Sequence, residues 1–159
     1  MARQHYIVPQ GAVEDSITVR LGAGSGSANF LTPTDTGKIV KLAGDSRYDL
    51  AVAGNEIEAF ITSVELAPQG DFSIGGVLDE GIAYATADGL EGTPGTGAIV
   101  VGDYVVAGTI TAKGTKLAAY SKVCKATSQG TQKFKWRVVS LGTAGTGAVG
   151  TTIVLQPLC

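Results

Sequence analysis

The stretch Lys133-Phe-Lys-Trp-Arg-Val138 alternates basic and apolar side chains over its whole length. Successive side chains of a β-strand point to opposite faces of the sheet, so this spacing predicts a strand with Phe134, Trp136 and Val138 on one face. The stretch Ser16-Ile-Thr-Val-Arg-Leu21 shows the same period of two. Strands that are apolar on one face and polar on the other are typical of antiparallel sheets.

Other short runs rich in β-branched residues lie outward from these two stretches, separated by Gly, Asp, Asn or Pro. They predict further strands at Lys38 to Leu42, Leu50 to Val52, Ile57 to Glu65, Gly76 to Ala85, Ala98 to Val106, Thr109 to Ala112, Lys122 to Ala126 and Thr152 to Leu155. The stretch Val105-Val-Ala-Gly-Thr-Ile110 predicts two strands that meet at a tight turn. Amphipathic helical stripes are hard to find. We therefore expect an all-β chain, an antiparallel β-sandwich or a distorted β-barrel with Gly-rich loops.

The domain organisation that we expect is an extended N-terminal arm over residues 1–15, followed by a single β-domain over residues 16–159. The second part could also form two small β-subdomains. Two Gly-rich loops, GTPGTGA at 92–98 and GTAGTGA at 142–148, are near echoes of one another. Their flanking residues do not repeat, so we interpret the echo as shared loop chemistry and infer no domain duplication.

The composition favours a folded chain with weakly polar surface. Of the 159 residues, 44% are hydrophobic and 16% are charged, against about 25% charged in typical globular proteins. Such a surface suggests that other subunits cover part of it. The formal net charge of −2 supplies no field that would attract a polyanion, so we expect no nucleic-acid partner. No run of about 18 apolar residues occurs, so we expect a soluble, unexported protein with no membrane partner.

Catalytic and metal-binding patterns are weak, and we expect no enzymatic activity, cofactor or metal. The only histidine, His5, lies in the expected arm, where it cannot be held rigidly against a nucleophile. Glu56 and Glu58 would share one strand face at a separation seen in glycosidases, although a solvated sheet face explains them better. A cation site of Asp45, Asp49 and Asn55 is conceivable but lacks EF-hand spacing.

The two cysteines are too few and too isolated for a disulfide framework or a zinc site. We expect Cys124 to be a small hydrophobic residue of a strand, and Cys159 to be an exposed thiol.

The basic ladder formed by Lys133, Lys135 and Arg137 allows three interpretations. It could be a solvated edge whose like charges discourage edge-to-edge pairing. It could bind an acidic protein surface, or it could bind phosphate in a nucleic acid. The solvated edge is the preferred interpretation and the acidic protein partner comes second.

The stretch from Asp35 to Glu65, DTGKIVKLAGDSRYDLAVAGNEIEAFITSVE, resembles the capsid decoration (cement) proteins of tailed bacteriophages. The resemblance continues through GVLDEGIAYAT at 76–86 and GAIVVGDYV at 97–105, with the late strand Phe134 to Ser140. It implies a virion protein, made in the host cytoplasm, that binds the outer surface of the assembled head. The implied partners are the major capsid protein and further copies of the chain, as a trimer or dimer. In the arm, Tyr6, Ile7 and Val8 are candidate contacts with a neighbour.

Two other functions fit the same composition. A phage tail or fibre-associated β-domain would share the fold but occur in few copies per particle. A carbohydrate-binding module would depend on Glu56, Glu58 and Trp136.

Overall fold

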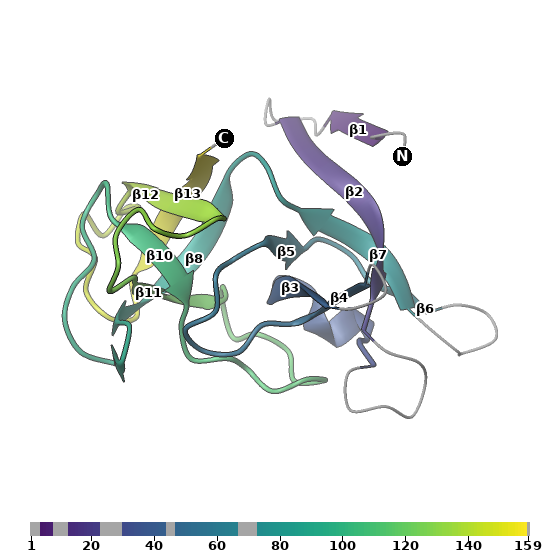
Figure 1. Ribbon diagram of the computed structural model, residues 1–159, viewed down its shortest axis with the longest axis horizontal. Coiled ribbons are helices and arrows are strands. Elements are labelled where there is room, and N and C mark those ends of the chain that lie inside the picture. Colours follow the sequence, from purple (N-terminus) through teal and green to yellow (C-terminus); the bar gives the residue numbers. More distant parts are fainter. Residues whose placement is uncertain (1–3, 8–12, 23–29, 44–46, 67–72, 159) are drawn as a thin grey trace. The chain divides into compact units, whose positions relative to one another are not determined.

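The computed structural model describes residues 4–7, 13–22, 30–43, 47–66 and 73–158. Apart from one short 3₁₀ helix, η1 (Pro33–Asp35), its regular elements are all β-strands, which confirms the predicted fold class. The strands are β1 (Gln4–Ile7), β2 (Val13–Leu21), β3 (Ile39–Ala43), β4 (Arg47–Leu50), β5 (Ala59–Ile61), β6 (Glu65–Leu66), β7 (Ser73–Leu78), β8 (Ala83–Leu90), β9 (Thr93–Pro94), β10 (Tyr104–Ala107), β11 (Lys122–Lys125), β12 (Lys135–Ser140) and β13 (Thr152–Leu158) (Figure 1).

The chain divides into two compact units, each assembled from three separate segments. Unit 1 comprises residues 1–50, 58–81 and 111–118, and it contains the sheet of β1 to β7. Unit 2 comprises residues 51–57, 82–110 and 119–159, and it contains the sheet of β8 to β13.

Each sheet closes on itself into a small barrel. In unit 1 the order β2-β4-β3-β5-β7 is closed because β7 also pairs with β2. In unit 2 the order β11-β10-β12-β13-β8 is closed because β8 also pairs with β11. Closure removes the free sheet edges that would otherwise leave backbone N–H and C=O groups unpaired. The short strands β1, β6 and β9 are added to these rings.

The two barrels have the same topology. Each ring has five strands, which in chain order are β2, β3, β4, β5 and β7 in unit 1 and β8, β10, β11, β12 and β13 in unit 2. In both rings the first of these strands pairs in parallel with the third and antiparallel with the fifth, and the second lies between the third and the fourth. The registers also agree: Val40 lies opposite Ala59 and Leu50, as Val105 lies opposite Trp136 and Lys125. The chain therefore builds one barrel design twice, a duplication that the loop echo alone did not lead us to infer.

A glycine makes the same cross-strand connection in each barrel. Gly37 donates its N–H to the carbonyl of Ile61 at 2.7 Å, and Gly102 donates to the carbonyl of Val138 at 2.8 Å. Their φ angles of 85° and 95° lie in the left-handed region, which glycine adopts without steric cost. Ile61 and Val138 each return a bond of 2.9 Å, to the carbonyls of Lys38 and Asp103.

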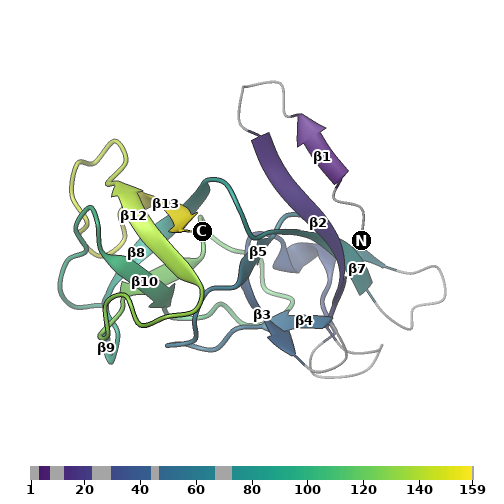
Figure 2. The same cartoon turned by 45° about the horizontal axis from the view of Figure 1, so that its top comes forward.

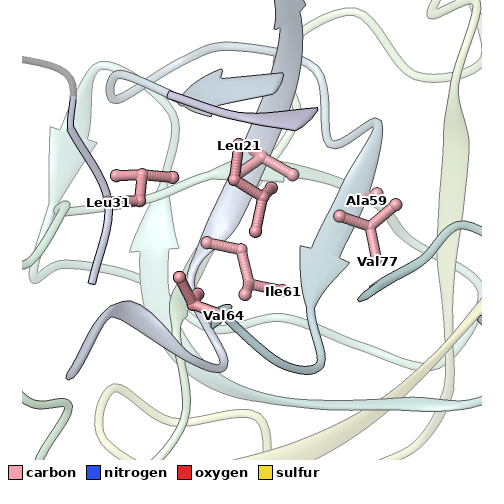
Figure 3. Packing of buried hydrophobic residues seen from close by; sticks show 7 residues of the cluster. Leu21, Leu31, Ala59, Ile61, Val64 and Val77 are labelled. Atoms are coloured by element: carbon pink, nitrogen blue, oxygen red, sulfur yellow. The ribbon is translucent and has the colours of Figure 1, made fainter. Parts of the chain in front are cut away.

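Each barrel has its own buried apolar side chains. Figure 3 shows the unit 1 cluster, where side chains from several strands and from two loop segments meet. Its members are Leu21, Leu31, Val40, Ala59, Ile61, Val64 and Val77. In unit 2 the largest fully buried side chain is Trp136, and Ile99, Val138, Ile153 and Leu155 are also buried.

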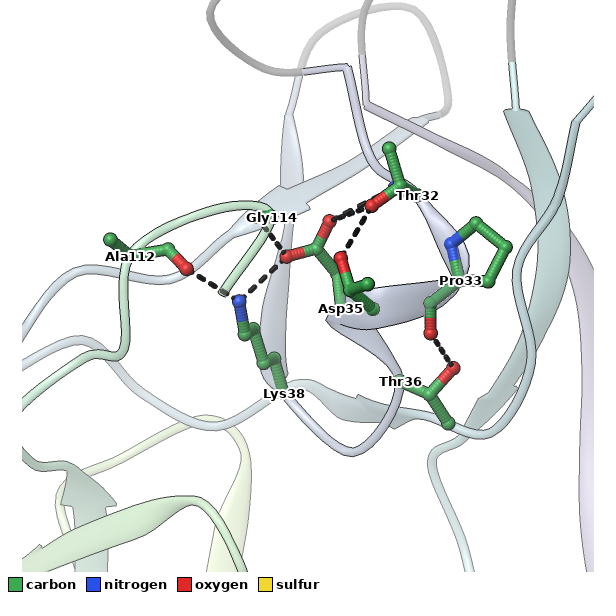
Figure 4. A network of polar contacts seen from close by, with 8 residues as sticks. Thr32, Pro33, Asp35, Thr36, Lys38, Ala112 and Gly114 are labelled. Carbon is green, nitrogen blue, oxygen red and sulfur yellow. Dashed lines mark hydrogen bonds and ion pairs between the residues drawn. The ribbon is translucent and has the colours of Figure 1, made fainter. Parts of the chain in front are cut away.

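A buried ion pair fastens the segment 111–118 within unit 1 (Figure 4). The Lys38 ammonium donates to Asp35 Oδ1 at 2.6 Å and to the carbonyl of Ala112 at 2.7 Å. Asp35 also accepts bonds from Gly114 N at 2.7 Å and from the N–H and hydroxyl of Thr32. The two charges are almost fully buried, at 0% and 2% exposure, so each depends on the other for compensation.

The surroundings of Asp35 favour its ionised form. Burial by itself would raise the pKa of this carboxyl, but the bonds from Lys38, Thr32 and Gly114 outweigh burial and hold the pKa below its usual range. Asp88 in unit 2 has the same balance, because bonds from Thr109 and Lys122 lower its pKa against the effect of burial.

Several predicted strand boundaries are wrong. The run Gly76 to Ala85 is not one strand, because β7 ends at Leu78 and β8 begins at Ala83 in the other unit. The run Ala98 to Val106 contains a turn before β10, and Thr109 to Ala112 forms no strand. Consequently β10 pairs with β11 and β12, and the tight turn predicted around Ala107-Gly108 does not form a hairpin.

The first fifteen residues include paired backbone. Strand β1 lies antiparallel to β2, with Tyr6 opposite Glu14 and Ile7 opposite Val13, and the two strands run side by side in Figure 2. Of the residues expected to form an arm, 4–7 therefore form β1 and 13–15 begin β2, and the two strands pair with each other. Val8 lies outside the described residues.

The buried ion pair generates a mutational prediction. Asp35→Asn removes the negative charge but leaves the Lys38 ammonium buried, so we expect the free energy of unfolding to fall by about 3–5 kcal/mol in urea titrations near neutral pH. Glu65→Gln, at an exposed position of β6, is the control and should change it by less than about 0.5 kcal/mol. Equal effects of the two substitutions would contradict the assigned role of Asp35.

The lowered pKa values of Asp35 and Asp88 generate a pH prediction. A carboxyl whose folded pKa is depressed stabilises the fold above its unfolded pKa of about 3.9, and this stabilisation is lost as the pH falls below that value. We expect the urea midpoint of the wild type to decrease steadily below about pH 4. Asp35→Asn starts from a lower midpoint but should lose less on acidification, since one of the two titrating groups is gone.

Candidate interaction surface

Two tyrosines are stacked and half-exposed on unit 2. Along β8, Ala83 and Ala85 are buried, whereas Tyr84 between them is 53% exposed. The ring of Tyr84 stacks on that of Tyr120, which is 45% exposed, with their centroids 5.6 Å apart. Large aromatic side chains held in this way lose little conformational freedom on binding and dominate many protein interfaces.

The face that carries Tyr84 continues across two more strands. Tyr84 lies opposite Val154 in β13, and Gln156, two residues further along β13, lies opposite Arg137 in β12. The intervening Leu155 is buried, as the period of two requires. We name this surface the outer face of unit 2 and define it by Lys135, Arg137, Gln156, Val154, Tyr84 and Tyr120.

The cations of the outer face have no ion pair with any described residue. Unit 2 has four acidic side chains, and each is already engaged within the unit. Asp88 pairs with Lys122 at 3.3 Å and Asp103 with Lys125 at 2.9 Å. Glu91 accepts the N–H of Thr127, and Glu56 accepts those of Lys133 and Phe134. Among the described residues of unit 2, no acidic side chain is therefore paired with Lys135 or Arg137.

The predicted basic ladder is only partly formed. Lys135 and Arg137 lie two residues apart in β12 and share one face, as predicted. Lys133 precedes the strand, which begins only at Lys135, because Glu56 binds the backbone of Lys133 and Phe134. The prediction that Phe134 shares a strand face with Trp136 is wrong as well, since the strand begins after it and Phe134 is 43% exposed whereas Trp136 is buried.

A second exposed surface lies where the two echoing Gly-rich loops meet. Ala98 and Ala148, the last residues of the two loops, pair in an antiparallel bridge, and Ile99 donates its N–H to the carbonyl of Gly147 at 3.0 Å. A Cβ on Gly147 would stand only 1.7 Å from the carbonyl oxygen of Ile99, so only glycine fits there. Beyond the bridge, Val100 and Val101 are 54% and 57% exposed. We name these two residues the valine turn.

Hydrogen bonds fix the conformation of the valine turn. Val100 N donates to Asp103 Oδ2 at 2.9 Å, and Asp103 N donates to the carbonyl of Val100 at 3.1 Å. The carboxylate of Asp103 is held in turn by its ion pair with Lys125. The exposed valines thus stand on a rigid turn above the buried Ile99.

The residues weighed for catalysis are not arranged as one site. Glu56 lies in unit 2 and Glu58 in unit 1, and no strand includes residues 55–58. Glu58 accepts the N–H of Leu42 at 2.6 Å, so both carboxylates serve as backbone acceptors. The expectation that they share a strand face is wrong. Of His5, the structure describes only the pairing of its backbone with Asp15.

The proposed carbohydrate platform is also wrong in one respect. Trp136 is 1% exposed and therefore cannot stack on a sugar ring. Of the three residues considered for a cation, Asp45 lies outside the described part of the chain. Asp49 pairs with Arg47, and the side-chain oxygen of Asn55 accepts the N–H of Val52. Among the described residues, no three acidic, His or Cys side chains are grouped as a metal site would require.

Cys124 is a buried strand residue, as predicted. It is 1% exposed in β11, and burial raises the pKa of its thiol to about 11. Such a thiol is unreactive at neutral pH. Cys159 lies outside the described residues.

Sequence reasoning missed both the valine turn and the tyrosine pair. Val100 and Val101 were included in a predicted strand, although the Gly-Asp step that follows them is a turn signal. Tyr84 and Tyr120 are far apart in the sequence, and no local pattern connects them.

No protein-family model, curated protein sequence or solved structure matches the chain. Within the described ranges, no helix is long and apolar enough to cross a membrane.

The architecture of the valine turn generates a prediction. Ile99→Ala removes a fully buried side chain and should lower the free energy of unfolding by about 2–5 kcal/mol. Val101→Ser alters only an exposed side chain and should change it by less than about 0.5 kcal/mol. Urea titration of the two variants beside the wild type checks both values, and a large loss for Val101→Ser would mean that Val101 is part of the core.

Proposed function

We propose that this chain is a non-enzymatic structural subunit, a decoration protein that binds the outer surface of an assembled tailed-phage head and stabilises contacts between major capsid subunits. The observation that carries the proposal is the valine turn, a rigid apolar surface displayed to solvent. The resemblance of residues 35–65, 76–86 and 97–105 to decoration proteins supports the same assignment.

The chemistry around the valine turn suits a contact driven by apolar burial. Residues 92–102 and 138–158 contain no Asp, Glu, Lys or Arg. Full burial of a valine side chain contributes roughly 1.5 kcal/mol or more, and the valines are about half-exposed, so each offers only part of this. Because the turn is already fixed by hydrogen bonds, little conformational entropy opposes binding.

A weak contact of this kind is effective on a repetitive shell. A subunit that binds only the assembled lattice stabilises that state by mass action, as a ligand stabilises the conformation that it binds. Many copies on one head multiply the effect. Closed barrels suit this role. Because the edges of the ring strands are paired, the barrels bind a partner through exposed side chains and not through open strand edges.

The test uses undecorated heads of the phage whose genome encodes the chain. The wild type should bind at stoichiometric, symmetric positions and raise the temperature at which the heads release DNA. The double variant Val100→Ser, Val101→Ser should bind at least about tenfold more weakly, with affinity little affected by salt, since no charge is involved.

Val52→Ser is the matched control, because Val52 is 58% exposed on the same unit but lies outside the valine turn. Its binding should equal that of the wild type. Stoichiometric binding that the double variant retains would refute the role of the valine turn. Binding of only a few copies per particle would instead favour a tail or fibre-associated domain.

A further inference from the structure

Residues 35–38 in unit 1 and residues 100–103 in unit 2 form equivalent four-residue turns. In each turn the backbone N–H of the fourth residue donates to the carbonyl of the first, at 3.2 Å in unit 1 and at 3.1 Å in unit 2. The third residue of each turn is the glycine with a positive φ that bonds to the fourth strand of its ring. Asp35 and Val100 therefore occupy the same position in the two barrels.

In unit 1 this turn is covered by the segment 111–118, which forms neither helix nor strand (Figure 4). Gly114 donates its N–H to Asp35 Oδ1 at 2.7 Å. The side chain of Leu117 lies beside Gly37, where it stands 3.1 Å from the position that a Cβ would take. The covering segment thus contacts the first and the third residue of the turn.

The second residue of the turn stays outside this cover. Thr36 is exposed, whereas Asp35 before it is fully buried, at 0% exposure. One side of the turn is therefore packed under the segment, and the other side forms the rim of the contact.

The turn of unit 2 has no such cover among the described residues. Val100, at the position of Asp35, is 54% exposed, and no described residue beyond the chain neighbours lies within 4 Å of a Cβ built on Gly102. The covering segment of unit 1 belongs to the long connection between β10 and β11, the second and third ring strands of unit 2. The corresponding connection in unit 1, between β3 and β4, has only residues 44–46. The chain therefore has no reciprocal connection of comparable length.

A segment that covered the turn of unit 2 would meet apolar chemistry. In unit 1 the covered side chains are a buried ion pair, which bonds to the backbone of the covering segment. In unit 2 the first residue is Val100, and the carboxylate of Asp103 is already engaged by Lys125 and by the N–H of Val100. The complementary segment is therefore uncharged, with an aliphatic side chain for Gly102 like that of Leu117 in unit 1.

We infer that an uncharged loop segment of the shell protein lies over residues 100–103 as the segment 111–118 lies over residues 35–38. Its aliphatic side chain packs against Val100 and Gly102. Val101 is equivalent to the exposed Thr36 and remains at the rim. The inference rests on the proposed function and specifies the contact, because it divides the valine turn into a covered residue and a rim residue.

The test compares Val100→Ser with Val101→Ser in binding to the undecorated heads. The two valines are matched controls for one another, since they are neighbours with exposures of 54% and 57%. Val100→Ser should weaken binding at least about tenfold, which is the whole loss expected for the double variant, because it replaces a buried aliphatic contact with an unpaired hydroxyl. Val101→Ser should change the affinity less than about twofold, since a rim side chain stays in water.

The single variants separate this inference from the proposed function. Equal losses for the two variants, or a larger loss for Val101→Ser, would overturn the inference, although stoichiometric binding of the wild type and its loss in the double variant would still support the proposed function. A wild type that does not bind the heads would overturn both.

A photo-crosslinking residue identifies the covering segment. p-Benzoylphenylalanine in place of Val101 stands at the rim, so it should leave binding intact and cross-link on irradiation to one stretch of the shell protein. Mass spectrometry should show that this stretch contains Leu, Ile or Val and no Asp, Glu, Lys or Arg. The same residue in place of Val52 is the control and should give no cross-link to the shell. Cross-linking from position 101 to a charged stretch, or to another copy of this chain, would contradict the inference.

Discussion

Closure of each sheet is the constraint on which the rest of this protein depends. In both units the first strand of the ring pairs with the third and with the fifth, and a glycine with a positive φ just before the second strand donates its N–H to the fourth. With the ring closed, inward positions such as Val40 and Val105 are buried in both barrels. Outward positions are then free to differ.

Charged residues at equivalent positions of the two barrels differ in whether they have a partner within their own unit. The position occupied by buried Lys38 in unit 1 is occupied by buried Asp103 in unit 2, and each has an internal partner of opposite charge, Asp35 or Lys125. These charges stabilise their own units. At the outward positions Glu58 and Lys135, no ion pair occurs among the described residues.

The valine turn and the outer face of unit 2 differ in their chemistry. The valine turn is neutral and rigid, so its binding depends on apolar area and is insensitive to salt. The outer face of unit 2 carries cations beside aromatic rings, so a contact there would depend on charge complementarity and would weaken with salt.

The sequence by itself determined the fold class, the alternation along β12, the burial of Trp136 and the inert character of Cys124, because these follow from the spacing and polarity of neighbouring residues. It also predicted that Lys135 and Arg137 share a face. Only the tertiary structure decided that two equivalent barrels form, that Val100 and Val101 are exposed, and that Glu56 and Glu58 bind separate backbone groups. Those outcomes depend on pairing between residues far apart in the chain, such as Ala98 with Ala148 and Tyr84 with Val154, which no local pattern encodes.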